Sequence, residues 1–251
     1  MHRRPPIYRL VLWNIDLTLV DVARVARGAY ADAFRKVTGR PLIALPQMVA
    51  RTDSEIFFEA LALNEAGPVP YRTEADGQEL LARYTTQLEV AFDARLGQLR
   101  TQGRALPGAL EAVAAVAELP GVVQSVLTGT IRPNAAAKLR AFGMDAFFDF
   151  EIGGYGSEVY PMGAQLLRSR GRVAEKYGGE IATNPAVYLG DSTRDVEAAR
   201  TGGARSVAVA SGRSTASELR EAGADIVLDD LADTDAVVTA VDRLTNAMSA
   251  G

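Results

Sequence analysis

The stretch L-V-L-W-N-I-D-L-T-L-V-D, Leu10 to Asp21, decides the fold class. Four large apolar residues, Leu10 to Trp13, precede an alternating polar set at Asn14, Asp16 and Thr18. An apolar run bounded by polar residues is typical of a parallel strand that is buried on both faces. Ligands of open α/β sheets bind beyond the carboxyl ends of such strands, so we expect a ligand near these polar residues. An ordinary strand-end turn also favours Asn, Asp and Thr, and that alternative stays open at this point.

Bulk composition excludes several classes of function. The chain has 251 residues, 48% hydrophobic and 23% charged, which is enough to bury a proper core. Its net charge of −4, without a block of like charges, argues against a nucleic-acid tail and against a polybasic membrane patch. We find neither an apolar run long enough to span a membrane nor a secretory signal, so we expect a cytoplasmic protein.

The absence of Cys and the single His limit which side chains could act in catalysis or bind a metal. The chain has no Cys, which excludes disulfides, thiolate metal sites and Cys nucleophiles. Its single histidine is His2, near the terminus, so we expect neither histidine-based catalysis nor a His-ligated zinc site. Carboxylates must therefore carry out any catalysis.

Hydrophobic periodicity divides the chain into two parts. From residue 107 onward, strand-like runs alternate with helical patterns, which is typical of a doubly wound parallel sheet. The strands expected there are 122–127, 147–152, 186–189, 206–210 and 226–228, and the helices are 107–118, 134–142, 162–177, 195–200, 215–222 and 233–248. Between the first strand and residue 99 the sequence predicts only helices, over 22–37, 54–63 and 73–96. We therefore expect a Rossmann-like α/β core of residues 1–21 and 100–251, with an all-helical cap domain inserted at residues 22–99.

Two later strand ends also carry polar residues. Thr128, Gly129 and Thr130 follow strand 122–127, where a hydroxyl and free backbone N–H groups suit an anionic oxygen, although Thr is also an ordinary helix cap. Asp191 and Asp195 follow strand 186–189 in the sequence G-D-S-T-R-D. Two carboxylates four residues apart suit Mg²⁺, which prefers oxygen ligands, although the second of them could instead cap the next helix.

Together the three strand ends resemble motifs one, two and four of the haloacid dehalogenase (HAD) superfamily: N-I-D-L-T-L-V-D, T-G-T and G-D-S-T-R-D. The K-L-R-A-F-G sequence that ends at Gly143 also resembles what commonly follows the second motif. The resemblance covers the whole chain and includes a helical cap after the first motif, as in the subclass related to phosphoglycolate phosphatases. It implies a magnesium-dependent phosphatase acting on a small phosphorylated metabolite.

The resemblance also implies catalytic roles. The superfamily's nucleophilic aspartate, which forms an aspartyl-phosphate, corresponds to Asn14, and its general acid and base corresponds to Asp16. Thr18 and Thr128 match positions that orient the aspartates and hold phosphate oxygens. Gly129 and Thr130 are expected to bind phosphate beside Thr128.

Metal and substrate roles follow in the same way. Asp191 matches a magnesium ligand and Asp195 supports the metal site. The side chain of Asn14 and the backbone carbonyl of Asp16 would complete the ligand set. Arg51, in a turn between cap helices, resembles the cap segment that faces the substrate.

Two positions depart from the superfamily pattern. Asn14 has a neutral amide oxygen, which is a poor nucleophile, and it removes one negative charge from the metal site. The third motif normally supplies a Lys or Arg at the start of the helix before the fourth motif, but residues 156–167 contain no basic residue. Arg168, Arg170 and Arg172 follow, and we expect them on a solvated face of the helix.

These departures leave two functions open. If Asn14 was engineered from Asp, the natural protein is an ordinary phosphatase. If Asn14 is natural, the alternative is a catalytically impaired HAD-fold protein. Such a protein would bind a phosphorylated ligand or a protein partner. Dehalogenase activity also needs an aspartate nucleophile and gains nothing from the acidic metal site.

Overall fold

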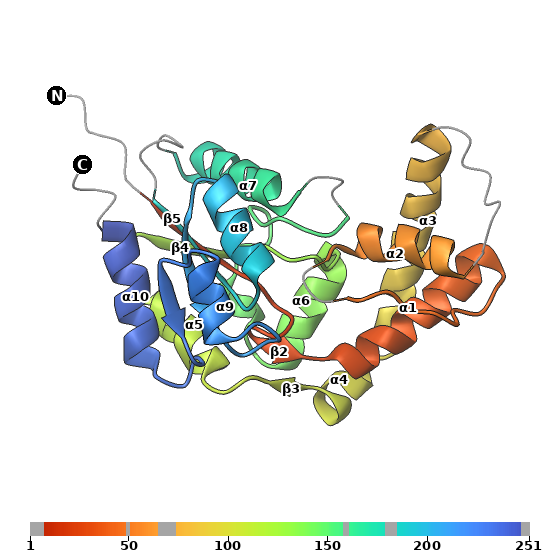
Figure 1. Ribbon diagram of the computed structural model, residues 1–251, viewed down its shortest axis with the longest axis horizontal. Helices are drawn as coiled ribbons and strands as arrows, with labels where there is room; N and C mark the ends of the chain where they lie inside the picture. The colour runs from red at the N-terminus through yellow and green to blue at the C-terminus, as the bar shows by residue number, and fades with distance from the viewer. Residues whose placement is uncertain (1–7, 49–50, 65–73, 158–160, 179–184, 247–251) are drawn as a thin grey trace.

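The central sheet of the computed structural model is parallel and has five strands (Figure 1). The structure describes residues 8–48, 51–64, 74–157, 161–178 and 185–246. The strand order is β4-β1-β5-β6-β7. The strands are β1 (Arg9–Trp13), β4 (Val122–Val126), β5 (Ala186–Gly190), β6 (Arg205–Val209) and β7 (Ile226–Leu228). Because β1 pairs with β4 on one side and β5 on the other, it is buried along its whole length.

Alternate side chains of β1 enter two separate cores. Val11 and Trp13 belong to a core cluster with α5 (Ala109–Ala117) and α10 (Thr234–Asn246). Leu10 and Leu12 belong to another with α7 (Met162–Tyr177) and α8 (Thr193–Thr201). Since successive side chains of a strand point to opposite faces, helices cover both faces of the sheet (Figure 1). The fold is therefore a doubly wound α/β sheet, as predicted.

The chain between β1 and β4 contains a helical insertion, defined here as residues 23–102. Its described part comprises α1 (Ala23–Thr38), α2 (Asp53–Leu63), α3 (Glu74–Asp93) and α4 (Leu96–Gln102), and the first three lie together beside the sheet in Figure 1. The two-residue strands β2 (Val20–Asp21) and β3 (Arg104–Ala105) pair antiparallel at its two ends. The proposed domain boundaries at residues 22 and 99 stay a prediction.

Hydrogen bonds to backbone carbonyls bring the helical insertion onto the carboxyl edge of the sheet. The N–H of Asp53 donates to the carbonyl of Gly129 at 2.7 Å, and the hydroxyl of Ser54 donates to the carbonyl of Gly156 at 3.0 Å. A Cβ at position 129 would lie 2.0 Å from the carbonyl oxygen of Arg51, so this close approach requires glycine. The start of α2 is thereby fixed beside the turn after β4.

The remaining helices complete the core, and one predicted strand is wrong. The helices are α6 (Arg132–Ala141), α9 (Ala216–Glu221) and the 3₁₀ turn η1 (Asp145–Phe147). Residues 147–152, predicted as a strand, begin in η1 and continue irregularly. Their aromatic side chains pack against the core, but the backbone meets β4 through single contacts, including Asp149 N–H to the Gln124 carbonyl at 2.9 Å, rather than a ladder.

Element boundaries differ from the predictions at several ends. The predicted helix 73–96 ends at Asp93, and α4 begins separately at Leu96. Thr52 caps α2 and forms a capping box with Glu55, and Asp53 is the first helical residue. Residues 73, 247 and 248, at the ends of two predicted helices, lie outside the described residues. None of the helices in the described ranges combines the length and apolarity needed to cross a membrane.

Candidate functional site

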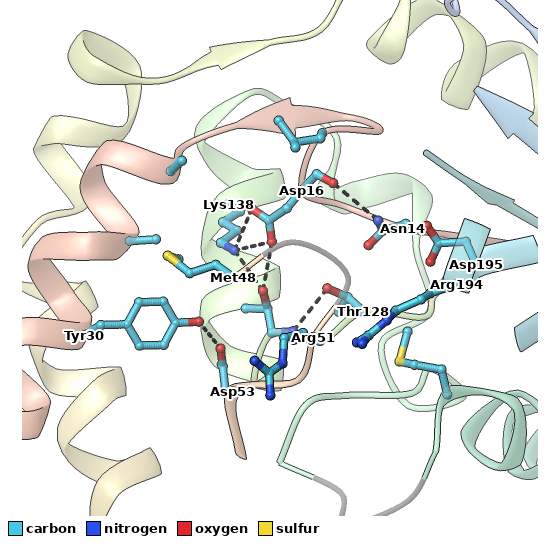
Figure 2. A pocket seen from close by; sticks show the side chains of 16 residues that line it. Asn14, Asp16, Tyr30, Met48, Arg51, Asp53, Thr128, Lys138, Arg194 and Asp195 are labelled. Carbon is cyan, nitrogen blue, oxygen red and sulfur yellow. Dashed lines mark hydrogen bonds and ion pairs between the residues drawn. The ribbon is translucent and has the colours of Figure 1, made fainter. Parts of the chain in front are cut away.

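A pocket lies at the carboxyl ends of β1 and β4, beside the helical insertion (Figure 2). Its lining includes Asn14, Asp16, Tyr30, Met48, Arg51, Asp53, Thr128, Gly129, Thr130, Lys138, Arg194 and Asp195. These residues are distant in sequence and meet because the carboxyl ends of parallel strands share one edge of the sheet. Most of the predicted site residues therefore come together. Thr18 and Asp191 are not part of this lining, although both contact the site.

Hydrogen bonds fix the amide of Asn14 in one orientation. The backbone N–H of Ile15 donates to Asn14 Oδ1 at 2.8 Å. Asn14 Nδ2 donates to Oδ1 of Asp191 at 3.0 Å and to the carbonyl oxygen of Asp16 at 3.3 Å. An amide lacks the anionic oxygen that attacks phosphorus, so this side chain cannot carry out the superfamily's nucleophilic step.

Asp191 is buried beside Asn14. Its Oδ1 accepts a second hydrogen bond from the hydroxyl of Thr18 at 2.9 Å, so Thr18 positions Asp191 and does not face the pocket. Its Oδ2 has no hydrogen-bond partner among the described residues, and a Cβ on Gly212 would lie 1.8 Å from that oxygen. Burial, reinforced by the charge of Asp195, raises the pKa of Asp191 to about 7, against the hydrogen bonds from Thr18 and Asn14.

Ser192 is the N-cap residue of α8, and Asp195, three residues later, completes a capping box with it. Asp195 Oδ2 accepts hydrogen bonds from the backbone N–H of Ser192 at 3.0 Å and from the Ser192 hydroxyl at 2.7 Å. Its Oδ1 accepts one from the hydroxyl of Tyr188 at 2.7 Å. Burial raises the pKa of Asp195, although these hydrogen bonds oppose that shift. Both carboxylate oxygens are therefore engaged in holding the end of β5 against α8.

Lys138, on α6, is a site residue that we did not predict. Its Nζ lies 2.9 Å from Oδ1 and 2.6 Å from Oδ2 of Asp16 (Figure 2). It also lies 2.8 Å from the hydroxyl of Thr130. The hydroxyl of Thr130 also lies within 3.0 Å of Asp16 Oδ2. The lysine side chain is 5% exposed, whereas that of Asp16 is 42% exposed. A buried ammonium group thus lies under an accessible carboxylate.

A sequence signal for Lys138 does exist. The buried residues of α6 are Asn134, Ala135, Lys138 and Leu139, which recur at the spacing of one helix face. A lysine on the apolar face of a helix is seldom buried without a partner. Lys138 therefore points to an anion beneath the helix, whereas the three arginines considered for the third motif do not reach this pocket.

Those arginines lie outside the pocket lining, and two of them contact other parts of the core. Arg168 is exposed on α7. Arg170 donates to the carbonyl of Gly203 at 2.9 Å, and Arg172 donates to the carbonyl of Gly153. Positive charge therefore reaches the described pocket lining from Lys138, Arg51 and Arg194 instead.

The helical insertion contributes its own polar group to the pocket wall. The Tyr30 hydroxyl, from α1, donates to Asp53 Oδ1, and the backbone N–H of Ile131 donates to Asp53 Oδ2 at 2.8 Å. Burial raises the pKa of Asp53 to about 6, although both hydrogen bonds and the charge of Lys138 oppose this shift. Arg51, from the turn before α2, forms an ion pair with Glu59.

The predicted magnesium ligands converge, but their donor atoms do not fit the ion as arranged. Asn14 presents N–H groups to Asp191 and to the Asp16 carbonyl, and Asp195 has both oxygens engaged. Mg²⁺ requires oxygen ligands in near-octahedral geometry. Within the described residues no group of three or more His, Cys, Asp or Glu side chains could hold a metal ion.

The site as it stands can bind an anion and transfer a proton. Thr128, Gly129, Thr130 and Lys138 meet at one wall of the pocket. The backbone N–H of Thr130 donates to the Thr128 hydroxyl at 3.2 Å, which fixes the turn. An ammonium group and hydroxyls at a strand-end turn suit a phosphate, and the carboxylate of Asp16 is accessible for proton transfer.

Comparisons with solved structures agree with this fold. A haloacid dehalogenase-like family protein from Streptococcus pneumoniae shares 16% identity, with a TM-score of 0.56 and coverage of 91% of this chain and 97% of that one. A predicted phosphatase from Clostridium acetobutylicum shares 15% identity, with a TM-score of 0.61 and coverage of 95% and 100%. A predicted phosphoglycolate phosphatase from Haemophilus somnus shares 20% identity, with a TM-score of 0.57 and coverage of 92% and 97%. At these identities the likeness concerns the fold alone.

Sequence comparison identifies the family. No curated protein matches the chain. The family model described as haloacid dehalogenase-like hydrolase matches residues 11–200, and a second one, HAD-hydrolase-like, matches residues 167–234. The first match covers most of the chain and includes the ends of β1, β4 and β5, where the pocket lies. The chain belongs to the haloacid dehalogenase-like hydrolase family.

Proposed function

We propose that the pocket binds a small phosphorylated metabolite, in a phosphatase-type site whose turnover is limited by the amide at position 14. The observation that carries this proposal is the buried ammonium of Lys138, within hydrogen-bond distance of Thr130 and Asp16 at the edge of the sheet. Burying a lysine is costly unless an anion or several acceptors compensate its charge. A phosphate beside Thr128 would provide such acceptors.

Asp16 is the proposed general acid and base. Its carboxylate is accessible from the pocket, and the leaving-group oxygen of a bound phosphomonoester would need a proton. Lys138 would hold the charge of the phosphate, since ammonium–phosphate hydrogen bonds are stronger than neutral ones. The nucleophile is the missing part, because Asn14 occupies its position.

The helical insertion is proposed to act as a cap that selects the ligand. Tyr30, Met48 and Arg51 line the pocket opposite the strand ends, and backbone bonds hold the insertion against the turn after β4. A ligand enclosed between two parts of a chain must be small. The mild net charge of −4 supports a small-molecule ligand rather than a nucleic acid. The expected location of the protein is the cytoplasm.

A magnesium-dependent phosphatase with Asp at position 14 is the second candidate. The observation that favours it is the retained pair of Asp16 and Asp191, with Thr18 positioning the latter. In that form the carboxylate would attack phosphorus, the ester bond would break, and Asp16 would protonate the leaving oxygen. Water would then release phosphate with Asp16 as base. The family generally uses Mg²⁺, and the extra negative charge would favour it.

An Asn14→Asp variant separates the two candidates. We expect the unsubstituted chain, which carries Asn14 and is called the natural chain here, to leave an aryl phosphate and a panel of sugar and small-acid phosphates intact. The variant should hydrolyse at least one of them when Mg²⁺ is present, because it regains an anionic nucleophile. Initial rates of phosphate release, with Mg²⁺ or with chelator, measure this difference.

Asn246→Asp is the matched control, since it adds the same charge at an exposed position at the end of α10. Hydrolysis by the natural chain at the rate of Asn14→Asp would refute the proposed limit on turnover. If neither form binds or hydrolyses any phosphorylated compound, the phosphate site itself is refuted.

A further inference from the structure

We infer that the amide nitrogen of Asn14 replaces the divalent cation of this site, so that the pocket binds phosphate without metal. The inference rests on the proposed phosphate site and goes beyond it. Two acceptors converge on Asn14 Nδ2, the Asp191 carboxylate at 3.0 Å and the Asp16 carbonyl at 3.3 Å. Oxygens that converge in this way suit a shared cation, and here they share the two hydrogens of an amide.

The alternative orientation of the amide is ruled out by its neighbours. Rotating the amide by half a turn would place Nδ2 against the N–H of Ile15, which now donates to Oδ1 at 2.8 Å. It would also place Oδ1 against the carbonyl of Asp16 and the carboxylate of Asp191. Three favourable contacts would become repulsive ones, since donors would face donors and acceptors would face acceptors.

The neighbouring carboxylates do not provide a set of free oxygen ligands in place of Asn14. Both oxygens of Asp195 accept hydrogen bonds from Ser192 and Tyr188. Both oxygens of Asp16 contact the ammonium of Lys138. Asp191 Oδ2, the remaining oxygen, lies against Gly212. Asp191 Oδ2 has no hydrogen-bond partner among the described residues and could bind a metal ion as it stands, but every further carboxylate or amide ligand would have to break an existing contact. Mg²⁺ tolerates little departure from octahedral geometry.

Positive charge for the ligand comes from the protein itself. Lys138 Nζ lies 2.8 Å from the Thr130 hydroxyl, next to the Thr128–Gly129 turn. A fixed ammonium can neutralise part of the charge of a phosphate, which is the task that a metal ion performs in other phosphate sites. Asn14 thus donates hydrogen bonds to both converging oxygens, and Lys138 supplies the positive charge.

Direct metal titration tests the inference. Mn²⁺ binding to the full chain, measured by electron paramagnetic resonance, and Mg²⁺ binding, measured by calorimetry, do not depend on catalysis. We expect Asn14→Asp to bind both ions at least about tenfold more tightly than the natural chain, because the ligand charge increases by one. Asn246→Asp should behave like the natural chain, and circular dichroism checks that both variants fold. Equal metal affinity in the natural chain and Asn14→Asp would overturn the inference.

Binding of inorganic phosphate provides a second readout. The natural chain should bind phosphate equally, within about twofold, in chelator and in Mg²⁺, whereas Asn14→Asp should need the metal. Phosphate binding by the natural chain only in the presence of Mg²⁺ would overturn the inference and leave the proposed function intact. Failure of both forms to bind phosphate would refute the proposed function, while the metal titration would still decide the role of Asn14.

Discussion

Lys138 combines two properties that seldom occur together in one side chain. It is almost fully buried, and its ammonium group contacts a carboxylate that remains accessible to solvent. The hydrogen-bond partners of the buried ammonium group are the carboxylate of Asp16 and the hydroxyl of Thr130, which compensate its charge. A phosphate in the pocket could share the ammonium without desolvating a new cation.

Lys138→Met should therefore weaken phosphate binding strongly while leaving the fold intact. Removing a charge-assisted hydrogen bond typically costs about 1.5–3 kcal/mol, so we expect the dissociation constant to rise by about ten- to a hundredfold. Calorimetric titration of the natural chain and the variant with inorganic phosphate measures this change. Lys36→Met, at an exposed position on α1, is the control and should bind phosphate normally. An unchanged affinity in Lys138→Met would remove this residue from the phosphate site.

At the scale of elements, the start of α8 shows how a buried carboxylate holds a helix against the sheet. Ser192 and Asp195 form a capping box in which each side chain bonds the other's backbone N–H. The capping box of Thr215 with Glu218 starts α9 at the surface. The two boxes share their geometry and differ in burial.

We expect Ser192→Ala to destabilise the protein more than Thr215→Ala. Loss of a cap costs about 1 kcal/mol in either helix. At Ser192 the buried carboxylate of Asp195 also loses a hydroxyl donor, which adds roughly 1–2 kcal/mol. Urea unfolding of the two variants measures the difference in the free energy of unfolding. Equal losses would mean that water or a rotated neighbour replaces the Ser192 hydroxyl.

Elements with strong local patterns were predictable from the sequence. The apolar run of β1 and the helix 162–177 follow from periodicity alone, and the structure has both. The segment 147–152 resembles a strand equally well, but it lies along the edge strand β4 without forming a ladder. Strand formation depends on a partner's backbone, which periodicity does not encode.

The candidate site was predictable where residues follow strands. Asn14, Asp16 and Thr128 come directly after β1 and β4, so the topology alone brings them to one edge. Lys138 reaches the same edge from the second turn of α6. Its role could not be predicted because the sequence does not show towards which part of the fold that face of the helix points. The role of Asp53 was not predictable from its sequence neighbours, because its side chain accepts a hydrogen bond from a backbone N–H 78 residues away.

At the scale of the whole molecule, Asp53 ties the helical insertion to the α/β core. Its backbone N–H bonds Gly129, and its carboxylate accepts from Tyr30 and from the N–H of Ile131. The charged groups that face it are Lys138, which lowers its pKa, and Asp16, which raises it. Tyr84, also facing Asp53, is neutral because burial raises its pKa further. The junction between the two parts therefore contains a buried carboxylate with few compensating charges.

This junction should make stability depend on pH. Burial raises the pKa of Asp53 to about 6, above the value of about 3.9 in an unfolded chain. Between these values the folded state binds a proton that the unfolded state has released. The contribution of Asp53 to stability is therefore complete below about pH 4 and is lost as the pH rises through about 6. Asp191, whose pKa is also raised, acts in the same direction at slightly higher pH.

Asp53→Asn should remove part of this pH dependence and stabilise the protein at neutral pH. Asn keeps an oxygen for the N–H of Ile131 and offers its amide hydrogens to the Tyr30 oxygen, without a charge to bury. A shift of two pKa units corresponds to about 3 kcal/mol, so we expect the variant to gain roughly 2 kcal/mol at pH 7.5 relative to pH 4. Urea unfolding across this range measures the gain, with Asp93→Asn, an exposed carboxylate on α3, as the control. Parallel pH profiles for Asp53→Asn and the natural chain would show that the Asp53 junction does not titrate on folding. A steeper profile in the natural chain than in Asp53→Asn would instead locate part of the protein's acid-linked stability at the contact between insertion and core.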